Sequence, residues 1–183
     1  YKSLAAHTLG YTQLITQNEF SRLSEKGYKV SDRIGRNGIE AAFESQLRGK
    51  WGGEMLEIDS IGTVQRSLGL KLPKAGQDRK LTLDLELQLT AEKVLSDKVG
   101  GAIVALDPRT GAIRAIASQP TFDLNFFSQP FTNIQYDNLF VSSKHPLLSR
   151  ALNAYDPGST WKPVTAIAGM ESGKFPASRK LNT

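Results

Sequence analysis

The residues with the clearest chemical potential lie near the end of the chain, where a serine and a lysine stand three positions apart. Ser159 and Lys162 form the single Ser-x-x-Lys match in the sequence, with a Pro-Gly pair before them and an apolar run over 164–170 after them. We expect Ser159 to lie where a loop enters a buried helix, with the Lys162 amine on the same helical face. A serine hydroxyl becomes a nucleophile only beside a base, and a lysine can be that base where burial or positive charge keeps it partly neutral. The spacing therefore predicts nucleophilic catalysis.

Pro163 constrains the backbone at this point, because a proline disfavours α geometry in the residue before it. Either Ser159 lies in the first helical turn, where a missing N–H costs little, or that turn is 3₁₀-like. The positive end of the helix would favour a serine alkoxide and disfavour a lysine ammonium. The simplest alternative is a helix-capping Ser159 followed by a solvated Lys162.

The composition indicates a folded chain without thiol chemistry. Its 183 residues are 39% hydrophobic and carry a net charge of +5, which fits one or two domains with a sizeable core. The basic residues are scattered, so nucleic-acid binding is not expected. Cysteine is absent and the two histidines, His7 and His145, are far apart, so no metal site is expected. No Gly-rich phosphate loop is present, and no cofactor is implied.

The first 79 residues are expected to mix short helices and strands. Leu4 to Gly10 predicts a short strand, and Thr16 with Glu19 forms a capping-box pattern before a helix that Gly27 would end. Asn37 and Glu40 repeat this capping pattern before an amphipathic helix over 39–47. Alternating residues over 55–59 and 62–68 predict a β-hairpin. The polar stretch 73–79 is interpreted as a linker, and the domain boundary is placed after residue 79.

The remaining residues predict a second set of elements. Lys80 to Asp84 reads as a strand whose aspartate caps a helix over 85–98. Strands over 101–106 and 112–117 flank a tight connection and form a hairpin. Aromatic residues over 118–131 either anchor a loop on the core or line a substrate groove. The carboxylate pairs Glu54/Glu57 and Glu86/Glu92 are expected on exposed faces.

The residues that flank Ser159 identify a protein family more specifically than the Ser-x-x-Lys pattern does. Tyr155-x-Pro-Gly-Ser-Thr-x-Lys-Pro163 closely resembles the active-site motif of the penicillin-binding proteins, the serine D,D-transpeptidases of bacterial cell-wall synthesis. Segments at 38–49, 81–88 and 107–111 resemble further segments of class B members, in the same order. The resemblance implies an α+β fold: a non-catalytic pedestal segment over 1–79, then the N-terminal part of a β-lactamase-like transpeptidase domain over 80–183.

The same resemblance implies acyl transfer at Ser159. The serine would attack the D-Ala-D-Ala bond of a stem peptide and hold the peptide as an ester, which the amine of a neighbouring stem peptide would resolve into a cross-link. Lys162 would be the base, and the backbone N–H of Ser159 is a candidate oxyanion donor. A β-lactam antibiotic would stall at the acyl-enzyme.

Two further family motifs, Ser-x-Asn and Lys-Thr/Ser-Gly, should lie downstream of the nucleophile, and neither occurs up to Thr183. Both ends of the chain look cut, and no signal peptide or membrane-spanning segment is visible. We therefore expect this chain to be inactive on its own. The resemblance places the whole protein at the periplasmic face of the cytoplasmic membrane in the cell envelope, with an anchor outside this chain and with elongation-complex membrane proteins as partners.

Two other readings stay open. A class D β-lactamase or a β-lactam sensor domain also uses Ser-x-x-Lys, although the pedestal-like segment before residue 80 argues against both. From a different class, residues 1–79 could serve mainly as a scaffold that binds other proteins of wall synthesis.

Overall fold

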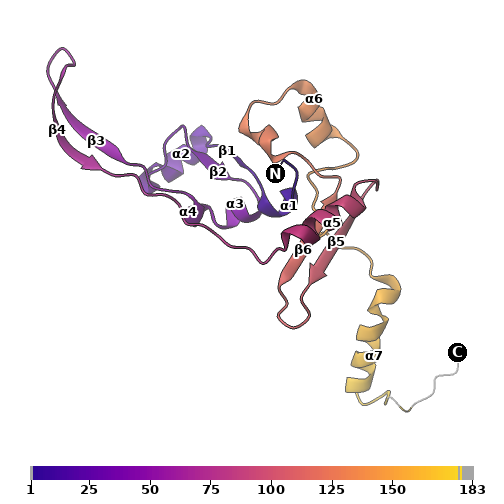
Figure 1. Ribbon diagram of the computed structural model, residues 1–183. Helices are drawn as coiled ribbons and strands as arrows, with labels where there is room; N and C mark the ends of the chain where they lie inside the picture. Colours follow the sequence, from indigo (N-terminus) through magenta and orange to yellow (C-terminus); the bar gives the residue numbers. More distant parts are fainter. Residues whose placement is uncertain (1, 177, 179–183) are drawn as a thin grey trace. The chain divides into compact units, whose positions relative to one another are not determined.

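The computed structural model describes residues 2–176 and 178, which belong to two compact units, Tyr1–Ala151 and Leu152–Thr183 (Figure 1). Within the described residues, the strands pair as antiparallel two-stranded ribbons, and short helices stand between them. Helices combined with antiparallel strand pairs, without parallel pairing in the described residues, are typical of an α+β fold. The α+β prediction is thereby confirmed.

The chain begins with a short helix, α1 (Ala6–Leu9), where the sequence predicted a strand. The N–H groups of Thr8 and Leu9 both donate to the Ala5 carbonyl, and Gly10 ends the helix at φ 80°. The predicted strand is therefore wrong. An apolar run this short fits either structure, and its alanines favour the helix.

The next elements follow local sequence signals closely. Strand β1 (Thr12–Leu14) pairs with β2 (Arg33–Gly35), and α2 (Gln17–Leu23) lies between them. The capping box is confirmed, because the Glu19 N–H donates to the Thr16 hydroxyl and the Glu19 carboxylate accepts the Thr16 N–H. A 3₁₀ turn, η1 (Ser24–Lys26), extends the helix to Gly27, which ends it at φ 77°.

The predicted helix over 39–47 is interrupted. Helices α3 (Gly38–Ala42) and α4 (Glu44–Leu47) are separated at Phe43, whose φ of −113° and ψ of 17° leave the helical region. Asn37 precedes α3 but does not cap it with its side chain; its Oδ1 accepts the Tyr11 N–H at 3.1 Å instead. The predicted second capping box is therefore wrong, because a partner outside the segment takes up the capping oxygen.

The first predicted hairpin is confirmed as β3 (Gly53–Ile58) and β4 (Val64–Lys71). The Asp59 carboxylate accepts the N–H groups of Ile61 and Thr63 at 3.0 and 2.8 Å, which closes the turn. Figure 1 shows this hairpin as a separate arm, and every residue of both strands is exposed.

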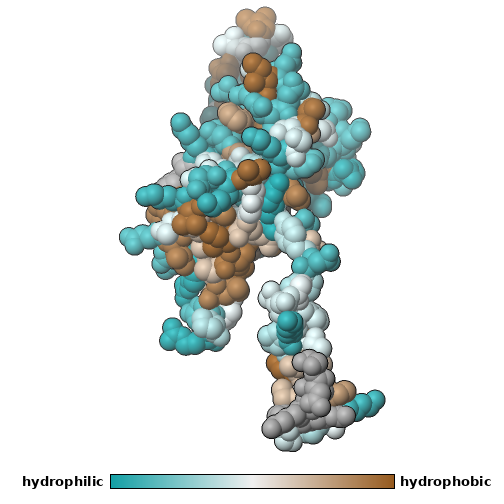
Figure 2. Space-filling view, turned by 90° about the vertical axis from the view of Figure 1, so that its right-hand side faces the viewer, coloured by the Kyte–Doolittle hydropathy of each residue, from teal (hydrophilic) through white to brown (hydrophobic). Residues whose placement is uncertain are grey.

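The second predicted hairpin is confirmed as β5 (Gly101–Leu106) and β6 (Ile113–Gln119), and α5 (Leu85–Leu95) packs on one of its faces. The buried side of α5 is formed by Gln88, Ala91 and Leu95 rather than by its other leucines. Ala91 and Leu95 pack against two strand residues, Ala115 and Ala117, which are 0% and 2% exposed. Apolar side chains also gather on the exposed surface of the first unit (Figure 2).

Lys80 to Asp84 does not form the predicted strand. The Thr82 hydroxyl donates to the Ile113 carbonyl at 2.7 Å and the Asp84 N–H to the Arg114 carbonyl at 2.8 Å, but no regular ladder develops. The predicted cap is present, since the Asp84 carboxylate accepts the Leu87 N–H at 3.0 Å.

The aromatic segment after β6 anchors on the core, as one of the two sequence alternatives predicted. Its short helical turns are η2 (Leu124–Ser128), α6 (Asn133–Tyr136) and η3 (Asp137–Val141). Phe122 and Phe127 are buried together with Ala6 and Leu139, and the Tyr11 ring stacks on Phe127. The first unit is thus held together by residues from both sides of position 79.

Candidate active site

Ser159 lies in a 3₁₀ turn, η4 (Gly158–Trp161), that leads directly into α7 (Lys162–Glu171). The Thr160 N–H donates to the Pro157 carbonyl, and the Lys162 N–H donates to the Ser159 carbonyl, which are i to i+3 bonds. This matches the second of the two geometries that Pro163 allows. Gly158 adopts φ 53°, a conformation that side chains with a Cβ rarely take.

The turn places Ser159 and Lys162 on one side of the backbone, because a 3₁₀ helix has three residues per turn. Both side chains are exposed. Among the hydrogen bonds and ion pairs of residues 2–176 and 178, none joins the Ser159 hydroxyl to the Lys162 amine. The two groups are neighbours without a direct bond, and their catalytic roles stay predictions.

Helix α7 forms where the sequence predicted it, but it is not buried. Val164, Ile167 and Met170 are 43–55% exposed, and the described part of Leu152–Thr183 has no buried residue. The expectation of a buried helix is therefore wrong for the described structure. A lysine base needs a dry or positively charged enclosure, and these residues alone do not provide one.

Arg150, near the end of the first unit, is held by hydrogen bonds within that unit. The Arg150 N–H donates to the Ser118 hydroxyl at 2.9 Å, and its guanidinium donates to the Lys144 and His145 carbonyls at 2.9 and 3.3 Å. The His7 ring contacts the Pro146 carbonyl at 2.7 Å, and burial lowers the pKa of His7. No local sequence pattern predicts these contacts, since their partners lie up to 139 positions apart.

One carboxylate differs from its sequence expectation. Glu92 is half-buried rather than exposed, and its Oε1 accepts the Ala5 N–H at 2.7 Å and the Gln88 amide at 2.8 Å. Gln88, which is 2% exposed, also accepts the Ile116 N–H at 2.8 Å. Glu92 therefore joins the start of the chain to α5 and β6.

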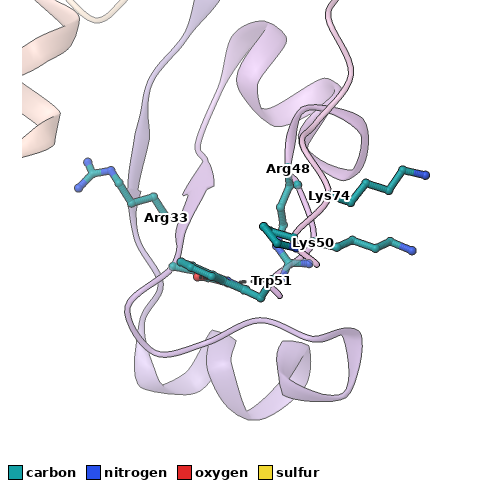
Figure 3. A pocket seen from close by; sticks show the side chains of 8 residues that line it. Arg33, Arg48, Lys50, Trp51 and Lys74 are labelled. Carbon is teal, nitrogen blue, oxygen red and sulfur yellow. Dashed lines mark hydrogen bonds and ion pairs between the residues drawn. The ribbon is translucent and has the colours of Figure 1, made fainter. Parts of the chain in front are cut away.

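A cavity of about 300 Å³ lies on the first unit, away from these contacts (Figure 3). We call it the cationic pocket, because four basic side chains line it beside one carboxylate and one indole: Arg33, Arg48, Lys50, Lys74, Asp32 and Trp51. The sequence predicted no site here, since the basic residues come from separate segments and only the fold brings them together.

Neither a metal-binding cluster nor a membrane-spanning helix occurs in the described part of the chain. It contains no cluster of three or more His, Asp or Glu side chains that could hold a metal ion. None of its helices is both long and apolar enough to cross a lipid bilayer.

Comparison with known proteins gives consistent results along the chain. Residues 1–81 match the family model for the penicillin-binding protein dimerisation domain, and residues 101–183 match the penicillin-binding protein transpeptidase domain. The peptidoglycan D,D-transpeptidase MrdA of Acinetobacter baumannii is 39% identical over 93% of this chain, which spans 25% of that protein.

Solved structures agree with the sequence matches. A complex between the penicillin-binding protein PBP2 and MreC from Helicobacter pylori aligns with a TM-score of 0.81 at 28% identity, covering 100% of this chain and 33% of that one. A peptidoglycan synthase complex that coordinates polymerization and crosslinking aligns with a TM-score of 0.80 at 35% identity, covering 98% and 33%. The chain thus spans about a quarter to a third of the length of these relatives.

Proposed function

Because the chain belongs to the class B penicillin-binding proteins, we propose that it carries the nucleophile of a peptidoglycan D,D-transpeptidase of cell-wall elongation. The observation that supports this most is the 3₁₀ turn η4, which contains Ser159 and leads directly into α7, whose first residue is Lys162. Residues 1–79 would be the pedestal and residues 80–183 the first part of the catalytic domain. The whole protein would work at the periplasmic face of the cytoplasmic membrane.

In this proposal, Ser159 Oγ attacks the carbonyl carbon of the D-Ala-D-Ala bond in a stem peptide while Lys162 accepts its proton. The oxyanion forms near the Ser159 N–H, which no hydrogen bond of the described residues uses. The lysine returns the proton to the departing D-alanine, and the peptide stays on Ser159 as an ester. The amine of a neighbouring stem peptide then displaces Ser159 and forms the cross-link.

A β-lactam would acylate the same hydroxyl, and this gives the direct test. We expect the full-length protein to be labelled stoichiometrically by a fluorescent penicillin, and Ser159→Ala to abolish the label. Ser172→Ala is the matched control, because Ser172 ends α7 and its hydroxyl bonds only to nearby backbone groups, Gly169 O and Lys174 N. Labelling that survives in Ser159→Ala would contradict the proposal, and rapid turnover of nitrocefin would favour a β-lactamase instead.

A second role is favoured by the exposed β3–β4 hairpin, whose apolar side chains have no cover in the described structure. One similar structure is a complex with MreC, and we infer that this protein also binds wall-synthesis proteins. Co-purification of the full-length protein with the MreC of the same organism tests this role. Absence of MreC from the purified material would count against that partner.

A further inference from the structure

The start of the chain, residues 2–10, lies across segments that are far from it in the sequence, and we call it the strap. The Leu124 N–H donates to the Lys2 carbonyl at 2.9 Å, and the Ala5 N–H donates to the Glu92 carboxylate at 2.7 Å. The strap belongs to the part of the chain that matches the dimerisation domain, whereas Leu124 belongs to the part that matches the transpeptidase domain. The strap therefore connects these two parts within the first unit.

His7 is the residue through which the strap contacts the loop over 144–148. Its Nε2 lies 2.7 Å from the carbonyl oxygen of Pro146, and Pro146 is buried. A carbonyl oxygen only accepts hydrogen bonds, so Nε2 must carry a proton, and Nδ1 is the nitrogen left to be protonated in acid. The His7 ring also packs edge to face against Phe122, which is 4% exposed, with 5.0 Å between the ring centroids.

The surroundings of His7 disfavour a positively charged ring. Burial is the largest influence and lowers the pKa of His7 from its ordinary value of 6.5. Arg150 lowers this pKa further, whereas the Pro146 carbonyl and Glu92 raise it, and the net direction is downward. Glu92 already accepts two N–H groups on one oxygen, and no ion pair joins it to His7 among the described residues.

Other ionisable residues on the segments that pack against His7 and α1 are not among the causes of the lowered pKa: Glu40, Arg114, Asp123, Lys144 and His145. The charge on a protonated His7 would therefore be balanced only by Glu92, against both burial and Arg150. A charge held in such a site is stabilised most simply by moving the ring into water.

We propose that the strap is released by acid, because a proton on His7 Nδ1 drives the ring out of its site beside Phe122 and Pro146. The proton comes from the solvent, and Nδ1 makes no hydrogen bond within the described residues. Water solvates the charged ring once it leaves, and the contact with Pro146 is lost. Acid thus loosens the connection between the strap and the loop over 144–148.

The direction of the pH dependence follows from the lowered pKa. The folded state binds fewer protons at His7 than the unfolded chain does, so the stabilisation is complete above pH 6.5 and falls as the pH drops below this value. Glu19 responds in a separate range, because its pKa falls from 4.5 to about 2. A measurement that stays above pH 4.5 therefore isolates His7 from Glu19.

The test follows amide hydrogen exchange in the full-length protein at about pH 7.5 and about pH 5.5, between which the charge of histidine changes. We expect the protection factors of the strap and of residues 144–148 to fall roughly threefold or more in acid, while the β5–β6 hairpin keeps its protection. His7→Gln should show no such fall, because its amide can donate from the position of Nε2 but does not titrate.

His145→Asn is the matched control. It removes the other histidine at an exposed position, and asparagine tolerates the φ of 45° found there. This variant should lose protection in acid as the parent does. If His7→Gln does not fold, the parent decides alone, since the strap and residues 144–148 must lose protection together relative to β5–β6.

Three results would overturn the proposal. Protection of the strap that does not change with pH would remove the switch, and an equal fall in His7→Gln would assign it to another group, such as Glu40, whose pKa burial raises. A fall that includes the β5–β6 hairpin would indicate general unfolding in acid. Penicillin labelling of His7→Gln at neutral pH should match the parent, so this proposal and the one on Ser159 stand or fall separately.

Discussion

Local sequence predicts both hairpins of the first unit, but the strands of the second hairpin are more apolar, and the surroundings of the two hairpins differ. The β5–β6 hairpin has α5 packed on one face, and Ala115 and Ala117 in β6 are almost completely buried. In the β3–β4 hairpin, β4 is one residue longer than β6, yet no residue of β3 or β4 is buried. An isolated two-stranded hairpin is at best marginally stable in water. The comparison teaches that an alternating pattern and an apolar pattern both predict strand pairing, whereas neither identifies the element that covers the pair.

The polar contacts of the two hairpins also differ in burial. The β5–β6 hairpin is joined to α5 through Gln88, which bonds to the N–H and carbonyl of Ile116 and to Glu92. The β3–β4 hairpin has polar contacts at its turn and the exposed pair Arg66 and Glu57. Buried polar contacts are costly to break, and exposed ones are nearly neutral. Substitutions should therefore change the free energy of unfolding strongly in the β5–β6 hairpin and weakly in the β3–β4 hairpin.

The largest effect is expected for Gln88→Ala. The change leaves the Ile116 N–H and carbonyl without their side-chain partner in a buried site, so the free energy of unfolding should fall by about 3 kcal/mol. Urea unfolding of the 183-residue chain, followed by circular dichroism, measures it. Gln65→Ala in the exposed hairpin is the control, because Gln65 donates one exposed bond to Asp59. Equal losses in the two variants would break the comparison.

Ala117→Leu should have the next largest effect. Ala117 is 2% exposed against α5, so added volume must displace its neighbours at a cost of about 2 kcal/mol. Leu70→Ala in β4 should change stability by less than about 0.5 kcal/mol, since Leu70 is 67% exposed. Thermal unfolding of both variants compares them. A large loss in Leu70→Ala would mean that β4 is covered in solution.

A smaller effect should depend on pH. The Arg36 guanidinium, together with the Thr16 N–H and hydroxyl, lowers the pKa of Glu19 from 4.5 to about 2. A lowered pKa stabilises the folded state above pH 4.5, and this contribution is lost as pH falls from 4.5 through about 2. The difference in Tm between the parent chain and Glu19→Gln should therefore be present at pH 7 and shrink toward pH 2. A difference that stays constant over this range would show that the charge of Glu19 plays no part.

The smallest effect is expected for the carboxylate–arginine pair of the exposed hairpin. Glu57→Gln removes its pairing with Arg66, whose side chain is 71% exposed, so the change should be about 0.5 kcal/mol or less. Thermal unfolding at low and high salt measures it, and the difference between parent and variant should vanish at high salt. A change as large as that of Gln88→Ala would contradict the division between the two hairpins.

The features that could be predicted from the sequence are those whose partners lie nearby along the chain. The Thr16–Glu19 capping box and the Asp84 cap each join residues three positions apart, and both hairpins close through short turns. The 3₁₀ turn at Ser159 could also be predicted as one of two geometries, because Pro163 restricts the backbone of the residues just before it.

The features that could not be predicted depend on distant partners. Asn37 looked like a cap, but the Tyr11 N–H occupies its side chain; Glu92 looked solvated, but the Ala5 N–H binds it across 87 positions. The cationic pocket needs Asp32 and Lys74 on one surface, and nothing in the local sequence pattern brings them together. Burial of α7 could not be judged either, since it depends on what else packs against that helix.

The hydrogen bond from the Ala5 N–H to the Glu92 carboxylate affects which substitutions homologous chains can accept at these two positions. The donor is a main-chain amide, so a change of side chain at position 5 leaves the bond intact, with proline as the exception because it has no N–H. Positions 5 and 92 should therefore show no correlated substitution among homologues, although they are in contact. Ala5 also adopts φ 49°, so glycine and asparagine should be favoured there for the shape of the backbone alone. A deep mutational scan would reveal this junction as intolerance of proline at position 5, paired with a need for a side-chain oxygen acceptor at position 92.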